Sequence, residues 1–445
     1  MNNSLFFSPN YKQITNFLCI FVMILPNQNC MNHTLYSFLI LTLTASPLSV
    51  LAQRHKIYSP NIATLQAVAD DKWQNMPLIQ LGTNQVMNFA FDDLTHEYHR
   101  YMYRIEHCEA DWTTSNEIFT SDYIDGFTED NLISNAEESL NTNIMYTHYS
   151  FQIPNSSCQI KISGNYKVTV YDENENKTPI LSFCFMVYES KMGVDMDVTS
   201  RTDHDINGCH QQVNVEINFN NLRVNDPTTQ IKTIILQNGR WDNAVYNPIP
   251  QYIMNDGLKW SHNNALIFNG GNEYRKFEIL DVNHTTMGIE DIGWDGKNYN
   301  AYLWTDEARP SYVYDETANG AFYIRNSDNN NNDIQSDYIL THFKLKSPKI
   351  NGEVYLNGTW TRNEFSPEYK LEYNETNKMY EGKVMLKQGY YSYQYLVLKP
   401  DGTTDIVPSE GNFYQTRNNY QALIYFKGIS DRTDRLVGHQ EVQIK

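Results

Sequence analysis

The stretch Tyr101-Met102-Tyr103-Arg104-Ile105-Glu106-His107 alternates bulky and polar side chains with a period of two residues. This alternation is typical of a β-strand that buries one face and leaves the other in water. The pattern recurs at residues 166–171 (YKVTVY), 213–219 (VNVEINF) and 353–356 (EVYL), with turn signals such as Asn238-Gly239 between strands. Regular short strands separated by such turns predict an all-β fold built from sandwiches.

Two breaks in the pattern divide the chain into successive units. The apolar run 183–187 ends the first strand-rich part, and the polar run 327–333 (SDNNNND) has no means of packing, so it predicts a loop. We therefore expect tandem immunoglobulin-like or early-set β-sandwiches with little helix. The expected ranges are 53–190, 191–335 and 336–445, the last of about modal domain size.

Composition excludes several classes of function. The 445 residues include 52 Asp and Glu against 34 Lys and Arg, giving a formal net charge of −18. Phosphate binding needs clustered cations, so we expect no nucleic-acid partner. The same balance disfavours a polybasic membrane surface. The 32 Tyr and 20 Phe suit pleated, half-exposed surfaces and again favour β structure.

The N-terminal 52 residues have the character of a targeting region. Neither of their apolar runs, 17–25 and 35–51, supplies the roughly 20 clean residues that a membrane span needs, so we expect no membrane insertion. Residues 31–52 end in Val50-Leu51-Ala52, which suits signal-peptidase cleavage. We predict a signal peptide at 31–52 and leave open whether Met1 or Met31 is the start.

The cysteine pattern favours disulfide chemistry over zinc. Cys19 and Cys30 would leave with the targeting region, and the remaining four include no C-x-x-C pair, so a structural zinc site is not expected. Cys158 and Cys184 flank a predicted strand pair and are the favoured disulfide in an oxidising compartment. Buried free thiols are the alternative.

Motifs for catalysis or metal binding are incomplete. His96-Glu97-Tyr98-His99 is one residue short of the H-E-x-x-H zinc motif. Residues 203–208 (DHDING) open like a calcium loop, but the twelfth position is Asn214 rather than Glu, so a hairpin turn is the better interpretation. A carboxylate pair for glycoside hydrolysis is defined by a distance that sequence does not give. We therefore predict no catalytic, cofactor or metal site, and no enzyme.

Ten segments, read in order, resemble one known family. They are 76–82 (MPLIQLG), 88–94 (NFAFDDL), 103–112 (YRIEHCEADW), 123–127 (YIDGF), 146–149 (YTHY), 163–166 (SGNY), 237–244 (QNGRWDNA), 271–275 (GNEYR), 386–393 (LKQGYYSY) and 411–420 (GNFYQTRNNY). Together they resemble the plug protein family of the type IX secretion system of Bacteroidota. The resemblance covers roughly residues 57–438; the N-terminal stretch and the Asn-rich insert at 327–333 depart from it.

This resemblance implies a non-catalytic periplasmic protein on the inner face of the outer membrane. Its partner would be the translocon barrel of the secretion system, whose periplasmic opening it would close. Five residues in the resembling segments place charge beside aromatic rings: Arg240, Trp241, Glu273, Tyr274 and Arg275. They are either partner-contact residues or internal hydrogen-bonding residues at turns.

The C-terminal unit suggests an alternative function. Segments 354–360 (VYLNGTW) and 379–384 (MYEGKV) resemble the early-set sandwich of starch- and glycogen-binding modules. Sugar binding there would need exposed aromatic faces, for which Trp360 and Tyr380 are the candidates. An exported carbohydrate-binding protein is therefore the second hypothesis, and core packing of both rings is the structural alternative.

Overall fold

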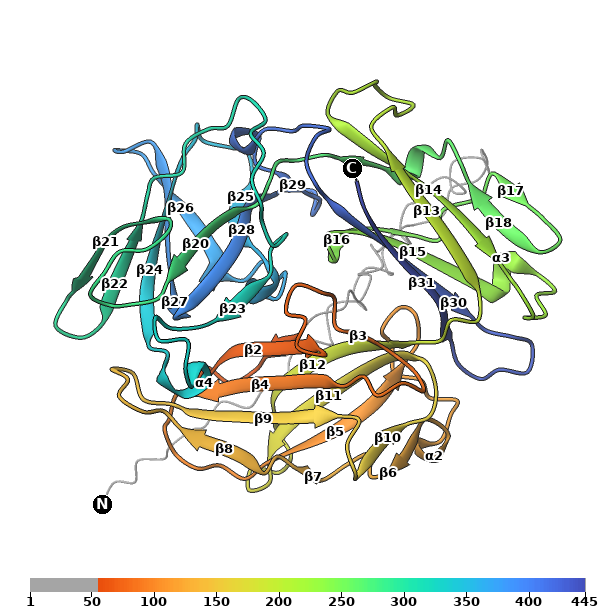
Figure 1. Ribbon diagram of the computed structural model, residues 1–445, viewed down its shortest axis with the longest axis horizontal. Coiled ribbons are helices and arrows are strands. Elements are labelled where there is room, and N and C mark those ends of the chain that lie inside the picture. Colours follow the sequence, from red (N-terminus) through yellow and green to blue (C-terminus); the bar gives the residue numbers. More distant parts are fainter. Residues whose placement is uncertain (1–54, 445) are drawn as a thin grey trace, which may run out of the picture. The chain divides into compact units, whose positions relative to one another are not determined.

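The computed structural model describes residues 55–444. The predicted targeting region 1–52, with its signal peptide at 31–52, lies outside the described residues. Within them, the predicted all-β fold of tandem sandwiches with little helix is confirmed: α2 (Thr120–Tyr123), α3 (Pro227–Gln230) and α4 (Asn332–Gln335) have four residues each. In this described part, no helix has both the length and the apolar content needed to cross a bilayer. Figure 1 shows three groups of strands, which we call the first, second and third lobes.

The first lobe contains two facing sheets. One has the order β1-β12-β11-β5-β7 with β3 beside β12, the other β2-β4-β9-β8, and β6 pairs with β10. The bounds are β1 (Lys56–Ile57), β2 (Ile62–Ala69), β3 (Leu78–Gln80), β4 (Met87–Asp93), β5 (Tyr101–Cys108), β6 (Ile124–Gly126), β7 (Asn131–Leu132), β8 (Asn135–Glu138), β9 (Thr147–Ile153), β10 (Cys158–Ile160), β11 (Gly164–Asp172) and β12 (Pro179–Tyr188). Stacked rings such as Phe89 and Phe151, with centroids 5.1 Å apart, fill its core.

The second lobe is a sandwich completed by the end of the chain. Its sheets are β13-β14-β18-β17 with β19 beside β14, and β16-β15-β30-β31. The bounds are β13 (Gly193–Thr199), β14 (His210–Asn218), β15 (Ile231–Gln237), β16 (Arg240–Tyr246), β17 (Tyr252–Ile253), β18 (Gly257–Trp260), η1 (Asn264–Leu266), β19 (Ile267–Asn269), β30 (Asn419–Phe426) and β31 (Arg435–Gln443). Ile231 pairs with Phe426 and Gln237 with Tyr420, so one core combines both segments.

The third lobe is one ten-stranded sheet, β20-β28-β25-β26-β27-β24-β22-β21, with β23 and β29 beside β28. The bounds are β20 (Arg275–Ile279), β21 (Ile289–Trp294), β22 (Tyr299–Leu303), β23 (Phe322–Ile324), β24 (Tyr338–Lys346), β25 (Glu353–Asn357), η2 (Thr359–Thr361), η3 (Pro367–Tyr369), β26 (Lys370–Asn374), β27 (Met379–Lys387), β28 (Gly389–Leu398), β29 (Thr404–Ile406) and η4 (Pro408–Glu410). Phe277 of β20 meets Phe343 of β24 with centroids 5.6 Å apart, so the sheet curls around a shared core.

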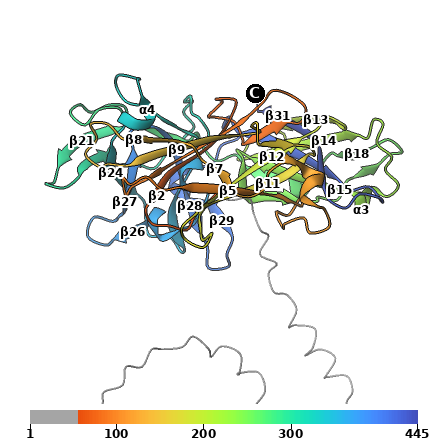
Figure 2. The same cartoon turned by 90° about the horizontal axis from the view of Figure 1, so that it is seen from below.

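Strand pairing cuts across linear order in the second half of the chain. Strands β20 to β23, within 275–324, pair with the third lobe, whereas β30 and β31 return to the second. The domain ranges 53–190, 191–335 and 336–445 stay a prediction. We propose that the folding units follow the three cores instead. Figure 2, from below, shows the first lobe facing the viewer, with β21 and α3 at opposite sides.

Candidate interaction surface

A buried ion pair joins the first lobe to the third. Asp92, at the end of β4, lies 2.5 Å from the Nζ atom of Lys387, at the end of β27, and both side chains are fully buried. The Nδ1 atom of His148 lies 2.7 Å from the other carboxylate oxygen. The Tyr338 hydroxyl donates a hydrogen bond of 2.7 Å to Asp92. Three strands far apart in sequence therefore converge on one carboxylate.

The surroundings of this pair favour the ionised form of Asp92, whereas burial lowers the pKa of Lys387. Burial disfavours the ionised form of Asp92, but Lys387 and His148 outweigh it and hold the pKa of Asp92 below its usual value. The Lys387 ammonium also lies 4.1 Å from the ring centroid of Tyr146. The Tyr146 hydroxyl donates to the Ser336 carbonyl at 2.8 Å, so the ring too bridges the two lobes.

The junction between the first and second lobes is mainly apolar. Cys108, Trp112 and Met186 of the first lobe pack against Leu236, Trp241, Leu423 and other residues of the second. The rings of Trp112 and Trp241 meet edge to face with centroids 5.8 Å apart. Ion pairs also contribute to this junction, among them the pair of Arg435 with Glu189.

Arg240 and Trp241 thus have internal roles. Arg240 pairs with Asp242 through Nη2 and Oδ2 at 2.6 Å, and both side chains are at most 5% exposed. Burial alone would lower the pKa of Arg240, but the Asp242 carboxylate outweighs burial and raises it. The Thr404 hydroxyl donates to the same carboxylate at 2.7 Å, which ties β16 to β29 of the third lobe.

The side chains of residues 273–275 likewise make their contacts inside the molecule. Glu273 accepts a hydrogen bond of 2.8 Å from the Tyr312 hydroxyl. The Tyr274 hydroxyl accepts one of 2.7 Å from Gln394. Arg275 contacts Glu410 at 2.9 Å and Asp306 at 2.7 Å. Of the two roles left open by the sequence, these contacts favour the structural one for all five residues.

Trp360 and Tyr380 are core residues, which corrects their assignment as glycan-stacking candidates. Their exposed fractions are 7% and 4%. The indole of Trp360 donates to the Ser392 carbonyl at 2.9 Å, and its ring packs against Phe343 and Tyr391. Because neither ring presents a face to solvent, neither is available to stack on a sugar.

The predicted pairing of Cys158 with Cys184 is also wrong in this structure. Cys158 is a buried thiol in the core of the first lobe, whereas Cys184 packs in the apolar junction that also contains Cys108. The two side chains belong to different packing clusters, so no disulfide joins them. Burial raises the pKa of Cys158 to about 12, which keeps its thiol protonated and unreactive.

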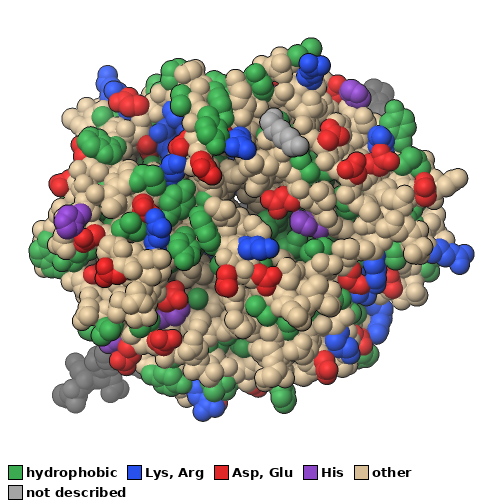
Figure 3. Space-filling view, viewed as in Figure 1, with side chains coloured by type: hydrophobic (Ala, Val, Ile, Leu, Met, Phe, Trp, Pro, Cys, Tyr) green, Lys and Arg blue, Asp and Glu red, His purple; other side chains and the backbone are tan. Residues whose placement is uncertain are grey.

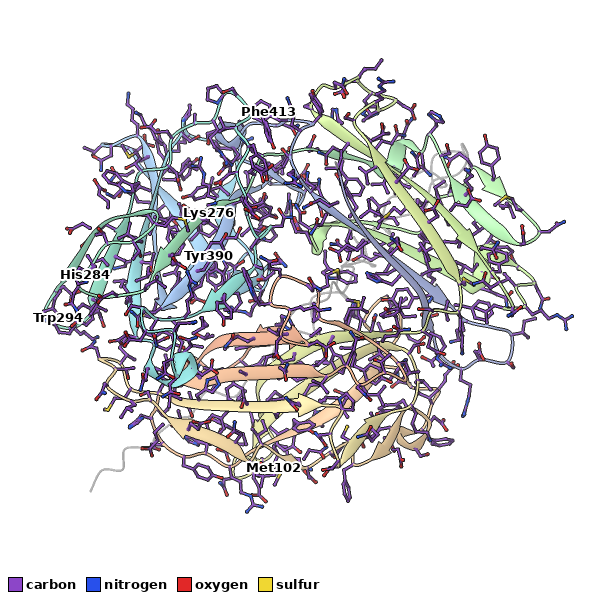
Figure 4. All side chains as sticks on the ribbon, in the orientation of Figure 1. Met102, Lys276, His284, Trp294, Tyr390 and Phe413 are labelled. Atoms are coloured by element: carbon purple, nitrogen blue, oxygen red, sulfur yellow. The ribbon has the colours of Figure 1, made fainter. Side chains whose placement is uncertain are left out.

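A groove of about 490 Å³ is the candidate contact surface. Trp73 of the first lobe contacts the rings of Tyr323 and Tyr390 of the third, with centroids 5.5 and 5.8 Å away. Figure 4 shows Tyr390 and Lys276 on the part of the third lobe that faces the centre of this view. Figure 3 shows hydrophobic side chains gathered on the same side of that centre. The rings of Trp73, Tyr323 and Tyr390 therefore form an aromatic patch that spans the first and third lobes.

Acidic side chains surround these rings. Glu278, Asp315 and Glu316 line the groove together with two arginines, Arg325 and Arg417. Burial and the nearby Asp315 carboxylate raise the pKa of Tyr390 to about 12, so its hydroxyl stays protonated and can donate. Exposed aromatic rings beside polar groups are typical of reversible protein interfaces. Sequence reasoning missed this groove because its lining comes from segments as distant in sequence as Trp73 and Tyr390.

Comparisons with known proteins agree with this architecture. A family model described as the type 9 secretion system plug protein first domain matches residues 62–189, the first lobe. A hypothetical protein from Parabacteroides merdae ATCC 43184, in a crystal structure at 2.30 Å resolution, is 37% identical with a TM-score of 0.85. That match covers 88% of this chain and 99% of the other.

Two further results add nothing to the assignment. Collagen adhesin from S. aureus is 9% identical with a TM-score of 0.11, covering 86% of this chain and 92% of the other, which carries no argument. No curated protein matches the chain. The family model and the likeness over nearly the whole crystal structure agree with the ordered segments. The chain belongs to the type IX secretion system plug protein family.

Proposed function

We propose that this protein is a non-catalytic periplasmic plug that binds the outer-membrane translocon barrel of the type IX secretion system and closes its periplasmic opening. Family membership is the observation that carries the proposal. A stopper must keep its shape under contact with a large pore. The fully buried Asp92–Lys387 pair and the Trp112–Trp241 contact fix the first lobe to the other two, which supports that role.

We assign partner contact to the groove that contains Trp73, Tyr323 and Tyr390. Its rings supply contact area at low entropic cost, and its carboxylates suit a polar or basic segment of the barrel. A groove that combines aromatic rings with polar side chains gives a reversible contact rather than a permanent one. Release of the plug from the barrel during secretion requires such a contact.

Gentle detergent extraction of outer membranes, followed by affinity purification of the barrel, tests the proposal. We expect the chain to co-purify with the barrel, and its deletion to make the outer membrane permeable to bulky solutes. Recovery of the chain only as a free monomer, with unchanged permeability, would contradict the proposal.

A matched pair of variants locates the contact. Tyr323, in the groove, is 38% exposed, and Tyr252, at the edge of the second lobe, is 58% exposed. We expect Tyr323→Ala to reduce co-purification several-fold and Tyr252→Ala to leave it unchanged. Equal effects of both variants would move the contact away from the groove.

A further inference from the structure

Three metal-ligating side chains of different chemistry meet at one corner of the second lobe. The Nδ1 atom of His210, the first residue of β14, lies 2.7 Å from Oδ2 of Asp205. The Sγ atom of Cys209 lies 3.5 Å from the same oxygen and 3.4 Å from that nitrogen. All three residues are part-exposed, so solvent ions reach them.

These separations are close to those around a tetrahedral zinc ion. Zinc binds sulfur at about 2.3 Å and nitrogen or oxygen at about 2.0–2.2 Å, so tetrahedral ligand atoms stand roughly 3.3–3.8 Å apart. The two sulfur distances already have these values. The Asp205–His210 distance is that of a hydrogen bond, and replacing the shared proton by an ion would widen it by about 0.6 Å.

The backbone holds the three ligands in place before any ion arrives. His210 pairs with Asn269 of β19, which fixes the start of its strand. Asp205 is held by a turn in which the Thr202 hydroxyl donates to its carbonyl at 2.9 Å. A Cβ on Gly208 would lie 2.5 Å from Oδ2 of Asp205, so only glycine lets the carboxylate reach Cys209. Such pre-ordering lowers the entropic cost of binding an ion.

A fourth ligand is within reach. The ring of His204, which is exposed, meets the ring of His210 edge to face with centroids 5.5 Å apart. Rotation of this exposed side chain about its own bonds would bring a ring nitrogen toward the group. A donor set of one sulfur, two imidazoles and one carboxylate suits zinc and not calcium, which prefers oxygen ligands.

We propose that Asp205, Cys209 and His210, with His204 as fourth ligand, form a zinc-binding site. On binding, the Cys209 thiol loses its proton to solvent and the thiolate binds the ion. His210 binds through whichever ring nitrogen is unprotonated. The site lies apart from the groove assigned to partner contact and does not depend on the proposed function.

Thiol labelling of the untagged mature chain tests the site directly. Cys108, Cys158 and Cys184 are buried, so the rapid phase of labelling by a disulfide reagent belongs to Cys209 and should vanish in Cys209→Ser. We expect equimolar Zn²⁺ to slow this phase at least about tenfold and Ca²⁺ to leave it unchanged. We also expect one zinc per chain after gel filtration, and none in Cys209→Ser.

His284 offers the control, because its Nδ1 atom lies 2.6 Å from Asp281 in a more exposed pair with no thiol beside it. His210→Gln should abolish the protection by zinc while Cys209 still labels rapidly, and His284→Gln should keep the protection. An unchanged labelling rate in Zn²⁺, or stoichiometric zinc retained by Cys209→Ser, overturns the proposal.

Discussion

The first lobe meets its two neighbours by opposite means. Toward the third lobe it presents a carboxylate, Asp92, that is fully buried against Lys387. Toward the second lobe it presents mainly Trp112 and sulfur-containing side chains, which pack on Trp241, and beside them the Ala110 N–H donates to the buried Asp434 carboxylate. Hydrophobic burial is non-directional, whereas a buried ion pair needs both charges in contact, since either charge alone is strongly destabilising. The polar junction therefore sets the geometry, and the apolar one adds area.

The largest expected effect comes from breaking the polar junction. Lys387→Met removes the cation and leaves Asp92 buried without its main partner. We expect a loss of about 3–5 kcal/mol in the free energy of unfolding. Urea denaturation followed by tryptophan fluorescence measures it; a loss below about 1 kcal/mol would mean that the pair does not hold the junction.

A double variant separates the unpaired charge from the lost packing. Asp92→Asn removes the charge and keeps an oxygen that accepts from Tyr338. Combined with Lys387→Met, it should restore at least about 1 kcal/mol relative to Lys387→Met alone. Simple addition of the two single losses would show that the charges do not interact.

A smaller effect is expected at the apolar junction. Trp241→Leu keeps an apolar side chain but removes the edge-to-face contact with Trp112 and leaves a partly filled space. We expect a loss of about 2–3 kcal/mol. Thermal unfolding should show it, and Trp241→Phe should lose less; the reverse order of the two variants would contradict the packing argument.

The stability of the junction between the first and second lobes should also depend on pH. Burial lowers the pKa of His107 to about 4, and its Nδ1 atom lies 2.9 Å from the Ser115 hydroxyl and 3.3 Å from the hydroxyl of Thr433 in the second lobe. Between pH 6.5 and 4 the unfolded chain binds a proton that the folded chain does not, so stability falls as pH falls.

His107→Gln isolates this contribution. The wild type should lose about 2 kcal/mol more than His107→Gln when the pH is lowered from 7 to 4.5. Denaturation curves at a series of pH values measure the difference. Parallel pH profiles would show that His107 is not kept neutral by the fold.

The smallest effect should come from a surface pair. Lys349 lies 2.5 Å from Glu375, but the two side chains are 64% and 70% exposed. Water screens such a pair, so Lys349→Ala should leave the melting temperature unchanged within error. A clear loss there would show that ion-pair geometry alone, without burial, stabilises this molecule.

Period-two alternation was enough to predict the β class, because half-buried strands impose it directly on the sequence. The domain ranges were less accessible, because sequence order does not reveal that β30 pairs with β15. The resembling segments turned out to contain both junctions: Asp92, Trp112, Tyr146, Trp241 and Lys387 all lie in them. Asp92, which directly follows the apolar residues 89–91 of β4, was the available signal for the buried pair.

Site prediction from sequence was limited by three-dimensional assembly. Aromatic residues in a β-rich chain can line a core or a surface, and Trp360 and Tyr380 line a core. The calcium template directed attention to Asp203 and Asn214, whereas the structure brings Asp205 next to Cys209 and His210. Spacing alone did not show which side of the turn the carboxylate would face.

The last hairpin of the chain has a consequence for how the protein matures. Until β30 arrives, the inner edge of β15 has no neighbour, and the second-lobe core lacks Tyr420 and Ile424. The whole third lobe lies between β15 and β30 in the sequence. Bringing such distant strands together is slow, and until then the open edge of β15 is exposed to other chains. A polypeptide that lacks β30 and β31 is therefore prone to aggregation or proteolysis. The second lobe is complete only in chains that contain both strands.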